Sequence, residues 1–225
     1  MIRTLNHKLR DKINLIVDEY FELIVKFINK KVVYYDTMKK ELLELNTSEK
    51  EIQIALTKYW NESFEELKDL FYNMFEDIYK IINEYLKKMY GGDLPEIKIK
   101  DLKDLLYNED GKTFEQRLYD HWYNAKNALD NNTTTDVVKR NLHYNFHKIA
   151  VTESRCIESN LKKMKKPITA EVLIIDPGAC DGGCPGGIYS VDFDDLPPYH
   201  PNCNCIPYYD EADPEEIEEL DLEVD

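Results

Sequence analysis

The chain has 225 residues, of which 44 are Asp or Glu and 29 are Lys or Arg, giving a formal net charge of −15. This length allows a real hydrophobic core in one or two domains, without metal or disulfides for bulk stability. No stretch approaches the roughly 18 uninterrupted apolar residues of a membrane span. The amino terminus also lacks the apolar run and cleavage site of a secretory signal. We therefore expect a soluble protein in a reducing compartment, with no membrane partner.

The negative charge is concentrated at the carboxyl end of the chain. From Asp210 onward there are ten acidic residues and no basic one, which leaves −5 for the rest of the chain. A segment with so few apolar residues and no aromatic residue has the composition of a solvated segment. We predict a flexible acidic tail over residues 210–225 that is dispensable for folding. Whether it only aids solubility or binds a basic partner stays open.

Residues 1–93 predict a long helical hairpin or coiled coil. In both halves apolar residues recur in alternating steps of four and three, which is a heptad pattern. These residues are Leu9, Ile13, Ile16, Tyr20, Leu23 and Phe27, then Trp60, Phe64, Leu67, Phe71, Met74, Ile78, Ile81 and Tyr85. A polar break separates the halves, Ser48 and Glu51 form a capping box for the second helix, and Gly91 supplies its stop. Because the first half has fewer large residues, we expect part of the aromatic stripe to stay exposed for a partner.

Residues 94–166 predict a helical segment that leads into the carboxy-terminal region. An extended linker comes first, followed by a short helix over 101–107. A capping box of Thr113 and Gln116 then opens one helix, and another runs from about Asp136 to Lys165. Their apolar faces are Phe114, Leu118, Trp122, Ala125 and Leu129, then Val138, Leu142, Phe146, Ile149 and Cys156. The lysines at the end of the last helix complement its dipole.

Residues 167–209 predict a small β module. Three short segments rich in branched and aromatic residues, ITAEVLII, GIYSVDF and CNCIPYY, are typical of strands. Three short strands are too small a sheet to be stable without further support. The predicted fold class is therefore α+β, mostly α, with a long helical body followed by a β module that needs a stabilising site.

Four of the five cysteines and one histidine gather in this module. Cys180 and Cys184 form one short pair, and His200, Cys203 and Cys205 follow after a loop. Two short chelating segments joined by a loop are typical of structural zinc sites. We predict one structural zinc ion held by four of these five residues. The spacing leaves open which four, since Cys203 and Cys205 can share a strand face and His200 and Cys203 can close a turn.

Other states of these cysteines are disfavoured. A reducing compartment argues against disulfides, and close clustering argues against isolated buried thiols. A catalytic zinc would need an open position and a general base, for which Asp181, Asp194 and Asp195 are the candidates. Five ligand candidates for four positions favour a closed structural ion instead. We therefore predict no catalytic residues and no cofactor besides zinc.

The segment LPPYHPNCNC resembles the carboxy-terminal signature of the Mu F-like phage head morphogenesis family, the minor capsid proteins of tailed phages. The residues that match this signature are Asp176, Cys180, Cys184, Gly187, Pro197, Pro198, His200, Pro201, Asn202, Cys203 and Cys205. The preceding helix adds Thr152, Glu153 and Arg155, which resemble the family's Ala-x-Thr-Glu segment. A weaker likeness in TFEQRLYDHWYNAKNAL extends the resemblance to roughly residues 113–209.

Two features depart from the family's pattern. Three residues separate Cys180 from Cys184 where the family usually has two, and Asn204 stands where an Arg is usual.

The resemblance implies a structural minor capsid protein of a tailed phage or prophage, without enzymatic activity. Such a protein is bound at the portal vertex inside the capsid of the virion and assists head assembly and DNA packaging or ejection; during assembly it is in the host cytoplasm. The implied partner is the portal protein, with the major capsid or scaffolding protein and a homo-oligomer around the portal as further candidates. We expect the helical body to carry the portal-binding surface.

Two alternative functions are open. A zinc-dependent hydrolase or toxin-like effector carried in the virion would need a catalytic motif, and the chain has neither HExxH nor a Gly-rich phosphate loop. A zinc-bearing nucleic-acid binder is disfavoured by the acidic residues beside the site, which are Asp192, Asp194 and Asp195.

Overall fold

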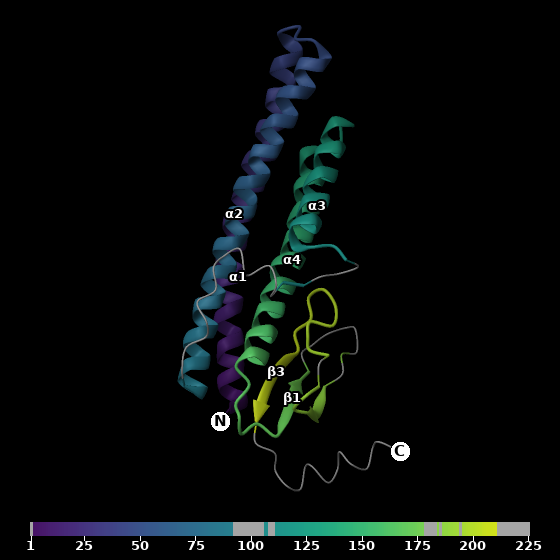
Figure 1. The fold of residues 1–225 in the computed structure, drawn as a ribbon. Coiled ribbons are helices and arrows are strands. Elements are labelled where there is room, and N and C mark those ends of the chain that lie inside the picture. Colours follow the sequence, from purple (N-terminus) through teal and green to yellow (C-terminus); the bar gives the residue numbers. More distant parts are fainter. Residues whose placement is uncertain are drawn as a thin grey trace, which may run out of the picture. The chain divides into compact units, whose positions relative to one another are not determined.

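The structure is a computed structural model that describes residues 2–91, 106–107, 111–177, 184, 186–193 and 195–210. Its elements are α1 (Ile2–Glu44), α2 (Glu49–Tyr90), α3 (Phe114–Asp130), α4 (Thr135–Met164), β1 (Val172–Asp176), β2 (Gly187–Ser190) and β3 (Ile206–Asp210). Four helices and a small antiparallel sheet confirm the mostly helical α+β class (Figure 1). The expected linker over 93–100, most of the expected helix over 101–107 and the acidic tail from 211 lie outside the described residues.

Local signals set the helix boundaries that the sequence predicts. Asn46 has a left-handed φ of 53° between α1 and α2. Ser48 then exchanges hydrogen bonds with Glu51, because the Ser48 backbone N–H donates to Glu51 Oε2 (3.2 Å) and the Glu51 N–H donates to Ser48 Oγ (3.4 Å). Gly91 follows α2 with a φ of 71°, which favours glycine. The capping box of Thr113 is also present at the start of α3.

The chain forms two compact units, each built from segments distant in sequence. Unit 1 comprises Met1–Ile16, Phe75–Tyr107 and Val151–Asp225, and unit 2 comprises Val17–Met74 and Asn108–Ala150. The division therefore does not follow the sequence order of the expected domains, because α1, α2 and α4 each contribute residues to both units.

Unit 2 has an aromatic core centred on two tryptophans. The stacked indole rings of Trp60 and Trp122 have centroids 4.1 Å apart. Each indole N–H donates to the other residue's backbone carbonyl oxygen, at 2.9 and 3.0 Å. Tyr35 packs edge-on against Trp60, and Phe146 stacks beside Trp122. This reciprocal pair buries two large rings and also satisfies both of their N–H groups.

The buried faces of α1 and α2 differ from the predicted heptad pattern. In α1 the fully buried residues move from Leu9 and Ile13 to Ile24 and Ile28, and Leu23 is 47% exposed. In α2 they shift from the predicted Ile81 and Tyr85 to Ile82 and Leu86. A straight helix with 3.6 residues per turn drifts by about 20° per heptad, so a strict seven-residue pattern gradually leaves its buried face.

The expectation that part of the aromatic stripe on α2 stays exposed fails from Trp60 to Ile78, and only Ile81 and Tyr85 at its end are partly exposed. Trp60, Phe71, Met74 and Ile78 are at most 1% exposed, and Phe64 is 8% exposed. These side chains are therefore core residues of the chain and are not available to a partner.

Unit 1 contains the sheet, in the order β2-β1-β3 with both pairings antiparallel. Leu173 in the central strand lies opposite Tyr189 of β2 and Tyr209 of β3. In Figure 1 the strands lie beside the C-terminal half of α4 and near the N-terminus of α1. Asp210, the first residue of the predicted acidic tail, is the last residue of β3 and therefore belongs to the sheet.

Candidate metal centre

A tight turn over residues 200–203 brings two ligand candidates together. The Cys203 backbone N–H donates to the His200 carbonyl oxygen at 3.1 Å, and Asn202 has a φ of 63°. Proline at the second position and a residue with positive φ at the third are the preferences of a type II turn. His200 and Cys203 therefore close a turn, which was one of the two arrangements that the spacing left open.

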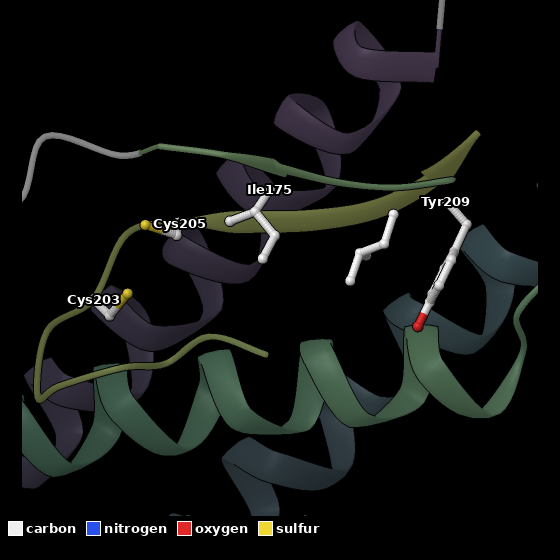
Figure 2. Close-up of a cluster of buried hydrophobic side chains, with 5 residues drawn as sticks. Ile175, Cys203, Cys205 and Tyr209 are labelled. Carbon is white, nitrogen blue, oxygen red and sulfur yellow. The ribbon is translucent and has the colours of Figure 1, made fainter. Parts of the chain in front are cut away.

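Three thiols meet next to this turn. The Sγ atoms of Cys184, Cys203 and Cys205 all lie within 4.8 Å of one another, a grouping that suits a metal ion. Cys203 and Cys205 are completely buried and lie just before the start of β3, close to Ile175 of β1 (Figure 2). Tetrahedral Zn–S bonds of about 2.3 Å place two sulfur atoms about 3.8 Å apart. The Sγ atoms of Cys184 and Cys203 are 3.8 Å apart, so this pair already has that spacing.

His200 lies beside the thiols with one ring nitrogen oriented by the backbone. Its Nδ1 atom is 2.9 Å from the Pro201 carbonyl oxygen, and its Nε2 atom is 2.9 Å from Cys184 Sγ. A carbonyl oxygen only accepts, so this contact places the proton on Nδ1 and leaves the Nε2 lone pair facing the sulfur. Metal-ligating histidines are oriented in this way by a hydrogen bond at the other nitrogen.

Cys180, the fifth predicted ligand, lies outside the described residues, as do Asp181 and Asp194. The choice between Cys180 and His200 therefore stays open. Of the predicted ligands, Cys184, Cys203 and Cys205 are brought together as one group, and His200 contacts that group through Cys184.

The surroundings of Cys203 favour its thiolate form. Burial alone would raise the pKa of this thiol, but backbone hydrogen bonds from Cys205 and Tyr199 and side-chain hydrogen bonds from Cys184 and Cys205 outweigh burial. The pKa of Cys203 is consequently lowered. Because the thiolate is the form that binds metal, this loop is electrostatically suited to ligation.

Two side chains from distant helices hold the ligand loop. Arg10 of α1 donates to the carbonyl oxygens of Asn204 (3.0 Å) and Cys205 (2.9 Å). Thr152 Oγ1 of α4 accepts a hydrogen bond from the Asn202 backbone N–H at 3.2 Å. Sequence reasoning missed the role of Arg10, since it is separated from Cys205 by 195 residues and no local pattern marks it.

Arg10 also belongs to a buried charge cluster. Its Nε donates to Glu158 Oε2, and Lys162 Nζ donates to Glu158 Oε1, both at 2.7 Å. Lys162 donates further to the Pro207 carbonyl oxygen at 3.0 Å. Burial would raise the pKa of Glu158, but the charges of Arg10, Lys162 and Arg155 lower it to about 2. Lys162 was expected only to complement the helix dipole, but it is 3% exposed and also donates to β3.

Asp176, which matches the family signature, forms an ion pair with Arg3 and also contacts His7. Its two carboxylate oxygens accept hydrogen bonds from Arg3 Nε and Nη2, both at 2.8 Å, and its Oδ2 lies 2.8 Å from His7 Nε2. Both partners lie in the first turns of α1, so Asp176 fastens the end of β1 to the start of the chain.

The comparisons with known proteins give no match: no family model, no curated protein and no solved structure is similar to the chain. The resemblance to the Mu F-like family therefore stays a prediction. Among the helices in the described part of the chain, none combines the length and the apolar character needed to cross a membrane.

Proposed function

We propose that the chain is a structural minor capsid protein of a tailed phage or prophage, bound to the portal protein at the portal vertex of the virion. In this proposal the helices form the body, and a zinc ion stabilises the carboxy-terminal module. The observation that supports it best is the grouping of Cys184 with the buried Cys203 and Cys205 within the segment that resembles the family signature.

The donor set fits a single zinc ion. Three sulfur atoms come from Cys184, Cys203 and Cys205, and the fourth position belongs to His200 or Cys180. Bound zinc would cross-link the β2 side of the module to the entry of β3. Structural zinc sites contribute about 10–16 kcal/mol of apparent binding free energy, which is ample for a three-stranded sheet.

The burial of the thiols supports a structural role over a catalytic one. Cys203 and Cys205 have no exposed surface, and they pack with Leu173 and Ile175 of the central strand. A catalytic zinc keeps one coordination position open to substrate. A site packed against the core of a small sheet suits a closed, four-ligand ion.

The portal contact would use the helical body, as the sequence predicts, but not the aromatic residues of α2 that the core buries. Binding to a ring of identical portal subunits repeats one weak contact many times and so raises retention.

Co-expression with the portal protein of the same phage or prophage tests this proposal. We expect the full-length chain to co-purify with the portal ring and to elute with it on size exclusion. A Cys203→Ser, Cys205→Ser variant should be retained less well, and a Cys156→Ser control, which removes a buried cysteine outside the thiol group, should be retained as the wild type is. Elution apart from the portal would refute the proposal. Metal-dependent hydrolysis or salt-sensitive DNA retention by the purified chain would favour one of the two alternatives.

A further inference from the structure

Arg155 of α4 is a buried cation with incomplete hydrogen bonding. It is 4% exposed, and its Nη2 donates to Asn14 Oδ1 of α1. Its Nε and Nη1 atoms are buried and have no hydrogen-bond partner among the described residues. Buried guanidinium N–H groups almost always have acceptors, so this position requires a source of negative charge.

Besides Glu158, the thiol group is a candidate for that charge. Thr152 and Arg155 are three residues apart and therefore share a face of α4. Thr152 holds the ligand loop at Asn202, so Arg155 lies on the helix face that the loop covers. Burial and the charge of Arg10 lower the pKa of Arg155 to about 9, whereas Glu158 and, to a smaller extent, Cys203 favour its charged form.

A count of buried charge supports this assignment. The cluster around Glu158 contains three cations, Arg10, Arg155 and Lys162, against one carboxylate. Glu153 is also buried but accepts from the Tyr107 backbone N–H at 2.7 Å, and cations remain in excess even when it is counted. A zinc ion with three thiolates and a neutral imidazole carries a net charge of −1, and one with four thiolates carries −2.

We propose that Arg155 is the charge-balancing residue of the metal centre, with its free guanidinium edge directed at the zinc-bound thiolates. This inference rests on the proposed zinc site. Without metal the thiols are free to be neutral and the three cations exceed the buried carboxylates, whereas bound zinc would create a negative centre that Arg155 stabilises. Arg155 is thus a positioning residue that raises zinc affinity without binding the ion.

Zinc affinity of the purified full-length chain tests the assignment, measured by competition with a chromophoric chelator at fixed pH and salt. Arg155→Met removes the charge and keeps most of the length. We expect it to bind zinc about tenfold or more weakly, as is typical when a residue that supports metal ligands is lost. Arg155→Lys keeps the charge and should recover most of the affinity. Cobalt(II) substituted into each variant should give the same absorption spectrum as in the wild type, because the ligands are unchanged.

Lys126→Met is the matched control. Lys126 is a 6% exposed cation of α3 that pairs with Asp130 in unit 2, so its removal lowers stability without touching the metal centre. Its zinc affinity should equal that of the wild type. Wild-type affinity in Arg155→Met, equal losses in Arg155→Met and Lys126→Met, or no recovery in Arg155→Lys would each overturn the proposal.

Two further outcomes, an Arg155→Met variant that does not fold and a wild-type chain that binds no metal, can be told apart from a failure of the role assigned to Arg155. If Arg155→Met does not fold, Asn14→Ala releases the guanidinium from its one described side-chain partner. Several-fold weaker zinc binding by this variant would support the proposal, and unchanged binding would overturn it. A wild-type chain that binds neither zinc nor cobalt would refute the metal site itself, and with it this inference.

Discussion

Replacing Glu158 with glutamine removes the carboxylate that pairs with Arg10 and Lys162 in the buried charge cluster of unit 1. Glu158 is 0% exposed and accepts hydrogen bonds from Arg10 and Lys162. The variant keeps the shape of the side chain, but it leaves three cations facing a neutral amide. Arg10 also holds the ligand loop, so the same change loosens the contact between α1 and Cys205.

Two considerations give the expected loss of unfolding free energy in Glu158→Gln. Breaking a buried ion pair while its partner stays charged costs about 3–5 kcal/mol. The difference between the ordinary pKa of 4.5 and the folded-state pKa of about 2 corresponds to about 3 kcal/mol of preferential stabilisation of the carboxylate. We therefore expect Glu158→Gln to lower the free energy of unfolding by about 3 kcal/mol at neutral pH.

Urea unfolding followed by circular dichroism, in excess zinc at pH 7, measures this loss. The matched control is Glu62→Gln on α2, where Glu62 and Lys58 form an exposed pair with a Glu62 Oε1 to Lys58 Nζ distance of 3.9 Å. Exposed pairs contribute about 0–1 kcal/mol, so the control should stay close to the wild type. A loss below about 1 kcal/mol for Glu158→Gln, or equal losses in the two variants, would refute the role assigned to the buried cluster.

Three other predictions concern the charge of Glu158, the tryptophan pair of unit 2 and the acidic segment after β3. Because the pKa of Glu158 is lowered on folding, its contribution is fully present above about pH 5 and is lost as the pH falls from 4.5 towards 2; the unfolding free energy of the wild type should therefore fall more steeply over this range than that of Glu158→Gln, and parallel curves would contradict the assignment. Trp122→Phe removes the N–H that donates to the Trp60 carbonyl and shrinks the stacked ring, so it should cost about 1–3 kcal/mol of unfolding free energy in urea titrations, and an unchanged midpoint would count against the tryptophan pair as the core of unit 2. A chain that ends at Asp210 keeps all of β3 and should melt within a few degrees of the full-length protein in calorimetry, because the acidic segment has too few apolar residues to offset the entropy of ordering it; a drop of many degrees would show that this segment docks.

The parts of the fold that local chemistry dictates were predictable from the sequence. The capping residues Ser48 and Thr113 mark helix starts because their side chains satisfy backbone N–H groups in the first turn. The apolar faces of α3 and α4 are buried as predicted, because each follows the 3.6-residue period over a short distance. On the longer α1 and α2 the assumed seven-residue repeat accumulated an error of about one position.

The contacts that support the candidate site could not be read from the sequence in the same way. The histidine and cysteine spacing was sufficient to predict that cysteines of this module gather at one site, but it left the turn at His200 as one of two possibilities. The anchoring of this loop by Arg10, and the pairing of Asp176 with Arg3, join residues that are more than 170 positions apart. Nothing in the local pattern distinguishes these arginines from solvated ones, because only the fold buries them or gives them partners.

Native mass spectrometry of the full-length protein, purified without added metal, tests the central claim most directly. We predict one zinc ion per chain in the wild type and in Cys156→Ser, and none in the Cys203→Ser, Cys205→Ser variant. The account also predicts that a chelator lowers the thermal midpoint of the wild type and that zinc restores it. A metal-free wild-type chain whose thermal midpoint responds to neither chelator nor zinc would contradict the claim that a metal ion stabilises the carboxy-terminal module.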